Sequence, residues 1–202
     1  MTIKRVAITG IGVFCGAGKG IEAFNQALQD GVSGIGTIDL IDTTPFTTSI
    51  GAQVKAYDPS CYFSRHEQRR LSRADQFGLI AAGEALQDSG VRDHYAPWDL
   101  GVSMGAGAAG MFQSEFWLKA RLEGGQASPA LLRGLLPDRT TTEIAQRFKL
   151  CGYQGSITTA CSSSATAIGW GADLIATGRQ KAVLAGGSDT LSVLTYAGFN
   201  SL

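Results

Sequence analysis

SITTACSSSATAIGWGADLIATG, residues 156–178, decides the fold of this chain of 202 residues, because it runs from a strand through a cysteine into a helix. The β-branched residues 157–159 favour extended backbone. The alanine-rich residues 165–176 favour a helix, which Gly178 can close in a left-handed conformation. The pattern therefore predicts Cys161 at a turn between a strand and a helix, which is typical of a nucleophile mount.

Cys161 has the surroundings that a reactive thiol needs. Free amide groups and the positive end of the macrodipole at a helix start stabilise a thiolate, which attacks thioesters far faster than a thiol does. The neighbouring residues 160 and 162–165 are all small, so a substrate can approach and backbone amides can meet a developing oxyanion. The alternative is that Cys161 is a small buried hydrophobic residue, as free cysteines usually are.

Five segments carry a resemblance that covers the whole chain. In order and spacing they resemble the N-terminal half of the β-ketoacyl-ACP synthases, the elongating condensing enzymes of fatty-acid and polyketide assembly. The segments are RVAITGIGV (residues 5–13), RRLSRADQFGLIAAGEAL (69–86), GVSMGAG (101–107), TACSSSATAIG (159–169) and VLAGGSDTLS (183–192). Five ordered segments are more specific than any single glycine motif.

The resemblance implies a role for Cys161. In the family the matching cysteine takes the growing acyl chain from acyl-ACP as a thioester, and malonyl-ACP then loses CO2 and condenses with it. Relatives that only set the chain length lack this cysteine, so its presence argues against a non-catalytic partner subunit. Because the acyl groups travel on the phosphopantetheine of acyl carrier protein, no cofactor is expected. A thiolase-like enzyme that acts on CoA esters remains an alternative.

The resemblance also implies that condensation needs residues beyond this sequence. In the family two histidines, a supporting lysine and one oxyanion amide come from C-terminal motifs of the types H-G-T-G-T and N-x-x-x-G-H. This chain contains only His66 and His94, and neither lies in such a motif. We therefore expect residues 1–202 to form a single N-terminal domain without its C-terminal half, which accepts an acyl group but does not condense efficiently.

Alternating strand and helix patterns predict an α/β fold. Strands are predicted at residues 5–9, 101–104, 156–159 and 181–185, and helices at residues 21–29, 69–89 and 111–122. This alternation implies a mostly parallel sheet covered by helices. The resemblance makes it one thiolase-like, layered α/β/α half. In the family a later antiparallel strand lies beside the first strand, so we expect a gap in the sheet with exposed apolar edges.

The resemblance extends to the assembly. The relatives are homodimers, so it implies a second copy, or a complementing C-terminal half, as the partner of this chain. The strand before Cys161 is the one expected to pair across the twofold axis. Left unpaired, that edge is an aggregation liability.

Charge and cysteine usage exclude several classes of protein. Lysine plus arginine and aspartate plus glutamate both number 17, so no bulk attraction to nucleic acid or to an anionic membrane is expected. The N-terminal residues hold no apolar run long enough for a signal peptide or a membrane span, which predicts a cytosolic protein. Cys15, Cys61, Cys151 and Cys161 show neither metal-ligand spacing nor a disulfide framework.

The glycine motif GAGAAG, residues 105–110, supports a rival hypothesis. It follows a predicted strand and precedes a predicted helix, as a dinucleotide-binding turn does. Against this, the acidic residue expected about 20 residues later should end a strand, whereas Glu123 ends a predicted helix. The resemblance instead places Gly107 and Ala108 along the acyl pocket. Relatives often carry a larger aliphatic residue where Ala108 stands, which predicts a roomier pocket.

A basic cluster is the second candidate site. Arg65, His66, Arg69, Arg70 and Arg73 lie within nine residues at the start of a predicted helix. Clustered charge at such a place is usually a solvated helix face. In the relatives a similar basic segment lies near the entrance used by the acidic acyl carrier protein, so the resemblance implies docking of that carrier on Arg65, Arg69 and Arg70.

Overall fold

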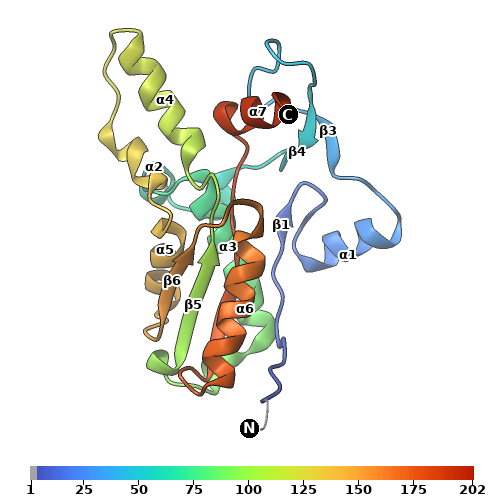
Figure 1. Ribbon diagram of the computed structural model, residues 1–202, viewed down its shortest axis with the longest axis vertical. Coiled ribbons are helices and arrows are strands. Elements are labelled where there is room, and N and C mark those ends of the chain that lie inside the picture. The colour runs from blue at the N-terminus through green and yellow to red at the C-terminus, as the bar shows by residue number, and fades with distance from the viewer. Residues whose placement is uncertain (1–3) are drawn as a thin grey trace.

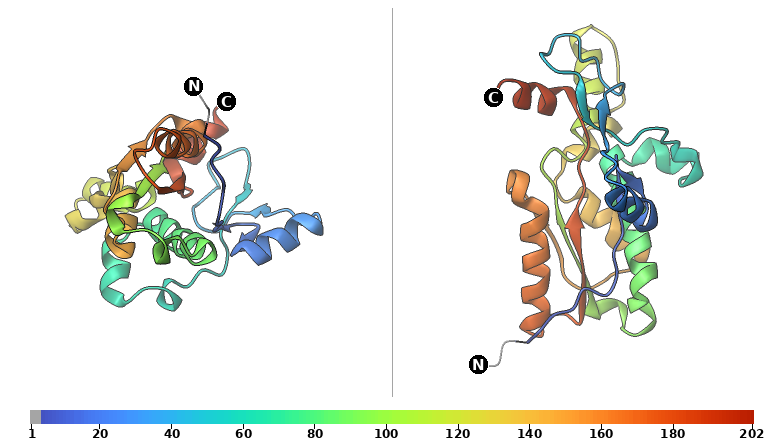
Figure 2. Two further views of the ribbon diagram at one scale, coloured as in Figure 1. Left: turned by 90° about the horizontal axis from the view of Figure 1, so that it is seen from below. Right: turned by 90° about the vertical axis from the view of Figure 1, so that its right-hand side faces the viewer.

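The computed structural model describes residues 4–202 and has the predicted α/β architecture. Its central sheet contains three parallel strands in the order β6-β5-β7, which are Gln154–Ile157, Leu100–Gly105 and Ala182–Gly187. Helix α6 (Ser163–Ala176) covers one face of this sheet, and helices α3 (Arg73–Ser89) and α5 (Arg139–Phe148) cover the other (Figures 1 and 2). The layered α/β/α fold expected from the sequence is therefore confirmed.

The apolar core lies between β5 and the two helices behind it. All six residues of β5 are buried, and Leu100, Val102 and Met104 belong to the same core cluster as residues of α3 and α5. On the opposite face Gly171 lets α6 lie close to β7, because a Cβ atom there would be 3.1 Å from Ala185 Cβ. Along β5 the large apolar residues alternate with Gly and Ser, and the strand is buried on both faces, as strands of parallel sheets usually are.

The remaining elements surround this sheet. They are helices α1 (Ile21–Gln29), α2 (Arg65–Arg70), α4 (Met111–Leu122) and α7 (Val193–Asn200), the hairpins β1–β2 (Phe14–Cys15 with Gly18–Lys19) and β3–β4 (Ile35–Thr37 with Ile50–Ala52), and short 3-10 turns at Pro59–Cys61, Val91–Asp93, Pro97–Asp99, Pro129–Leu135 and Ala160–Ser162. Helices α4 and α7 and the β3–β4 hairpin gather beyond the end at which the parallel strands finish (Figure 1).

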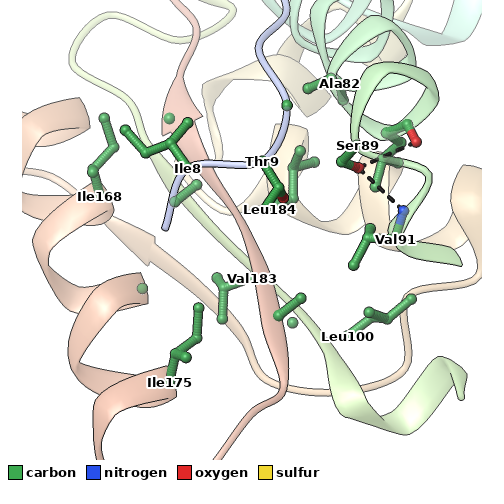
Figure 3. Close-up of a pocket in the computed structure, with 18 of the residues that line it drawn as sticks. Ile8, Thr9, Ala82, Ser89, Val91, Leu100, Ile168, Ile175, Val183 and Leu184 are labelled. Carbon is green, nitrogen blue, oxygen red and sulfur yellow. Dashed lines mark hydrogen bonds between the residues drawn. The ribbon is translucent and has the colours of Figure 1, made fainter. Parts of the chain in front are cut away.

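The predicted strand at residues 5–9 is wrong, because residues 4–13 form no strand. Their anchors are instead carboxylates of α3: Ile11 N donates to Asp88 at 2.9 Å, and Val13 N donates to Glu84 Oε2 at 2.8 Å. A cavity of about 980 Å3 separates this segment from β7. Figure 3 shows Ile8 on one side of it and Val183 and Leu184 of β7 on the other. The expected gap in the sheet is confirmed, and without a neighbouring strand the segment has no ladder to join.

The predicted helix at residues 69–89 is also wrong in its first turn, because the chain breaks it into α2 and α3. Ser72 Oγ accepts from Asp75 N at 3.1 Å, and the Asp75 carboxylate accepts from Ser72 N at 2.8 Å. This capping box begins a new helix at Arg73. The helix ends at Ser89, as predicted, and Gly90 follows it in a left-handed conformation with φ +61°.

A membrane-spanning helix and a metal-binding cluster are both absent from the residues that the structure describes. Within residues 4–202, no helix is both long enough and apolar enough to cross a membrane. The same part of the chain contains no group of three or more His, Cys, Asp or Glu side chains arranged to hold a metal ion.

Candidate active site

Cys161 lies where the sequence predicts it, between a parallel strand and a helix. Strand β6 ends at Ile157, a single 3-10 turn covers Ala160–Ser162, and α6 begins at Ser163. The thiol is exposed, so the alternative that Cys161 is a buried hydrophobic residue does not hold in this structure. At this end of the sheet the loops that follow β5, β6 and β7 come together.

Hydrogen bonds from the serines after Cys161 hold the turn. Ser163, which is buried, donates from its hydroxyl to Ala160 O at 2.7 Å and accepts from Thr159 N at 2.9 Å. Ser162 Oγ donates to Thr159 O at 2.9 Å. Ala160 has φ +52°, a left-handed conformation that costs free energy in a residue with a side chain. The serines therefore not only leave room for a substrate but also hold the strained turn that carries the Cys161 thiol.

Glycines let this turn lie directly on the sheet. A Cβ atom on Gly105, at the end of β5, would be 2.4 Å from the carbonyl carbon of Ser163. A Cβ atom on Gly187, at the end of β7, would be 2.5 Å from Ser164 Cβ. Real Cβ atoms do not approach so closely, so only glycine fits at either strand end. The start of α6, and Cys161 with it, is thereby set against the ends of two strands.

The loop after β5 carries the predicted pocket residues Gly107 and Ala108. A Cβ atom on Gly107 would be 3.8 Å from Ala160 O, so this loop is a neighbour of the cysteine turn. The cavity of about 980 Å3 lies elsewhere, because none of Cys161, Gly107 and Ala108 lines it. That Gly107 and Ala108 line an acyl pocket stays a prediction.

A carboxylate of the chain itself occupies the amides of the GAGAAG loop. Gly107 N donates to Asp189 Oδ2 at 2.8 Å, while Ala108 N and Ala109 N donate to Oδ1 at 2.7 and 2.6 Å. In a dinucleotide-binding protein such amides face a pyrophosphate. Because Asp189 already takes them, the structure does not favour the dinucleotide hypothesis. Sequence patterns alone do not single out Asp189, which is an acidic residue just after the half-buried strand β7.

The structure divides the basic cluster into structural and exposed residues. Arg65, His66 and Arg69 are exposed on α2. Arg70 instead forms an ion pair with Glu143, a side chain of which only 3% is exposed. Arg73 stacks on the rings of Tyr57 and Phe77, with its guanidinium carbon 5.0 and 4.9 Å from the two ring centroids. Its long side chain therefore serves the packing of an aromatic cluster.

Glu67 links α2 to its own cap and to α5. Hydrogen bonds from Ser64, and then the nearby Arg147 guanidinium, lower the pKa of Glu67 from 4.5 to about 2. Because the pKa is lower in the folded chain, this carboxylate stabilises the fold fully above about pH 4.5. That contribution is lost as the pH falls towards 2.

We expect Glu67→Gln to lower the free energy of unfolding by about 1 kcal/mol at pH 7, because the capping box loses its charge. Thermal unfolding of both proteins between pH 2 and 7 measures this, and the two stability curves should converge at the acidic end. Glu123→Gln is the control, because Glu123 is an exposed residue whose carboxylate is 4.0 Å from Lys119. A difference between wild type and Glu67→Gln that stays constant over the whole pH range would contradict this assignment.

The fold and the site together define a class. An exposed cysteine on a strained turn at the end of a parallel strand, in one α/β/α layer set, is an arrangement of the thiolase-like fold that solved ketosynthases share. The family model described as "Beta-ketoacyl synthase, N-terminal domain" matches residues 3–202. The chain therefore belongs to the β-ketoacyl synthase family, as the sequence resemblance indicated.

Individual relatives agree with this assignment. The chain is 33% identical to 3-oxoacyl-[acyl-carrier-protein] synthase 2 of Vibrio cholerae, over 100% of this chain and 50% of that protein. It is also 33% identical to a putative polyketide β-ketoacyl synthase 1 of Streptomyces cyaneus, over 98% of this chain and 50% of that protein. The chain thus spans about half the length of the curated relatives it matches.

Solved structures share the fold. A ketosynthase/chain length factor described for ishigamide superposes with a TM-score of 0.91 at 26% identity, over 99% of this chain and 51% of that one. A β-ketoacyl synthase from Burkholderia phymatum superposes with a TM-score of 0.80 at 24% identity, over 98% of this chain and 50% of that one.

Proposed function

We propose that this chain is the nucleophile half of a 3-oxoacyl-ACP synthase, in which Cys161 takes an acyl group from acyl-ACP. The observation that carries the proposal is the exposed thiol on a held turn at the end of β6. The curated relatives are named for synthesis on acyl carrier protein, which supports that substrate class. Because the acyl group arrives and leaves on a carrier thiol, the proposal requires no cofactor.

The proposed transfer uses the thiol of Cys161 as the nucleophile. Its thiolate attacks the carbonyl carbon of the acyl-ACP thioester, a bond forms between sulfur and carbon, and the carrier thiolate leaves and takes up a proton. The turn contributes orientation, because Ser163 and the glycine contacts of β5 and β7 fix the backbone under the sulfur. The product is an S-acyl Cys161 and free carrier.

Condensation in this family requires histidines, and neither histidine of this chain lies on the β6–α6 turn with Cys161. In that step malonyl-ACP loses CO2, its carbanion attacks the S-acyl carbonyl, and the Cys161 thiol is released. The two histidines belong to other places: His66 lies on α2, and His94 lines the cavity of about 980 Å3 that does not include Cys161. We therefore infer that a complementing half supplies the histidines of condensation.

Intact mass measurement after incubation with an acyl-ACP tests the transfer. We expect the mass of one acyl group on wild-type protein, and no 3-oxoacyl-ACP when malonyl-ACP is added. An adduct missing from a folded sample would contradict the proposed transfer, and sustained condensation by this chain alone would contradict the need for another half. Faster transfer from acyl-CoA than from acyl-ACP would favour the thiolase-like alternative.

Two free edges support the proposed assemblies. Strand β6 is at the outside of the order β6-β5-β7, so its outer edge can pair with the same strand of a second copy. On the other side, the cavity between β7 and residues 5–12 is lined largely by apolar residues and gives a complementing half a place to add a strand.

Carrier docking is proposed on the exposed arginines of α2. We expect the double variant Arg65→Glu, Arg69→Glu to raise the KM for acyl-ACP about tenfold at low salt, since charge reversal slows the encounter with an acidic carrier. Initial rates of Cys161 acylation against acyl-ACP concentration measure this. The matched control is Arg179→Glu, an exposed arginine after the far end of α6. Equal KM values for the double variant and the control would rule out docking at α2.

A further inference from the structure

Asp189 lies in the loop after β7, within the VLAGGSDTLS segment, 28 residues after the nucleophile in the sequence. Its carboxylate accepts three consecutive amides from the loop after β5, those of Gly107, Ala108 and Ala109, at 2.6–2.8 Å. Hydrogen bonds to an ionised acceptor are about twice as strong as bonds between neutral groups. One side chain therefore joins two of the three loops that meet beside Cys161.

The loop that Asp189 holds is strained. Ala109 has φ +45°, and a residue with a side chain adopts that left-handed conformation only when its surroundings impose it. The two amides that follow have their own acceptors, because Gly110 N donates to Gly134 O at 2.8 Å and Met111 N donates to Ala108 O at 3.0 Å. Residues 107–111 thus have every backbone amide satisfied within the chain.

A second carboxylate, on α4, accepts amides from the segment that follows Asp189. Glu115 on α4 accepts Val193 N at 2.9 Å and Leu194 N at 2.7 Å, which are the first two amides of α7. Asp189 therefore precedes α7 and holds the residues before α4, whereas Glu115 lies on α4 and holds the start of α7. Figure 1 shows both helices beyond the same end of the sheet. The two clamps join α4 and α7 into one unit.

The hydrogen bonds of Asp189 form the inner clamp and those of Glu115 form the outer clamp. The inner clamp is the one that lies beside the turn of the nucleophile. A Cβ atom on Gly107 would be 3.1 Å from Asp189 Oδ2 and 3.8 Å from Ala160 O, so the loop lies between Asp189 and the turn of Cys161. Ala160 and Ala109 are both left-handed, one in each of these neighbouring loops. Loss of the inner clamp frees the 107–109 loop beside the thiol, while loss of the outer clamp affects only the start of α7.

We propose that Asp189 is a positioning residue for acyl transfer: its carboxylate fixes the Gly107–Ala109 amides so that this loop forms a defined wall beside Cys161. The proposal rests on the proposed function of Cys161. It goes beyond that function, because it assigns the shape of the site to a carboxylate whose hydrogen bonds go to the loop amides.

The test compares Asp189→Asn with Glu115→Gln in the full chain. We expect Asp189→Asn to speed hydrogen exchange of the amides in the 107–109 loop, and to slow acylation of Cys161 by acyl-ACP, each about tenfold. Glu115→Gln should speed exchange at residues 193–194 and leave the acylation rate within about twofold of wild type. Ala109→Gly, added to Asp189→Asn, should restore part of the rate because glycine adopts φ above zero without strain.

Each outcome decides the question. Unchanged exchange at 107–109 in Asp189→Asn would overturn the clamp itself. Faster exchange with a wild-type acylation rate would overturn the positioning role, and equal slowing by Glu115→Gln would reduce it to general stability. A wild-type chain that takes no acyl group contradicts the proposed function, and the positioning role falls with it. The exchange data still decide separately whether Asp189 holds the loop.

Discussion

Replacement of Cys161 by serine is expected to abolish acylation of the chain, with a fall of at least about 1,000-fold in the rate of adduct formation. A serine hydroxyl at the same position remains protonated at neutral pH, and the turn presents no adjacent general base in its hydrogen bonds. The measurement is intact mass against time with acyl-ACP in excess. Serine is nearly isosteric, so the fold should not change.

The chain contains matched controls for this experiment. Cys61 and Cys151 are also exposed, but they lie at the end of a 3-10 turn and after α5, away from the β6–α6 turn. Cys61→Ser and Cys151→Ser should therefore acylate at the wild-type rate. An acyl adduct that persists in Cys161→Ser would show that the acyl group is attached without the Cys161 thiol. That result would support a non-catalytic partner subunit instead.

Features set by neighbours in the sequence could be predicted from the sequence. The position of Cys161 and the left-handed end of α6 at Gly178, with φ +76°, follow from short-range preferences of the backbone. The break between α2 and α3 was predictable too, because Ser72 and Asp75 have the spacing of a capping box. The longer apolar pattern of residues 69–89 instead favours one continuous helix.

Features set by distant segments could not be predicted in the same way. Residues 5–9 have the composition of a strand, but a strand exists only where a neighbour completes its ladder, and here a cavity lies beside them. Likewise, nothing near Asp189 in the sequence shows that its acceptor oxygens meet amides about 80 residues earlier in the chain. Arg70 and Arg69 are adjacent and identical in type, yet only the position of Glu143 separates their roles.

The second large effect concerns the contact between the sheet and the start of α6. Gly105→Ala is expected to lower the free energy of unfolding by about 3 kcal/mol, because the added Cβ would be 2.4 Å from backbone atoms of Ser163 and Ser164. Backbone cannot rotate away as a side chain can, so the start of α6 must move. A shift of about 1 Å in a reacting group costs about 100-fold in rate. Acylation of the folded fraction should fall by that order.

Gly186→Ala is the matched control, because it makes the same change in a neighbouring strand. Gly186 faces Met104 across the β5–β7 ladder, and a Cβ atom there would have no atom within 4 Å. Alanine should therefore stabilise β7 by about 0.5 kcal/mol through the lower entropy of the unfolded chain, without changing the acylation rate. Chemical denaturation and intact mass give both quantities for each variant. If Gly105→Ala matched Gly186→Ala in both, the start of α6 would not depend on the close approach at Gly105, and the turn of Cys161 would be held by its serine hydrogen bonds and by the contact at Gly187.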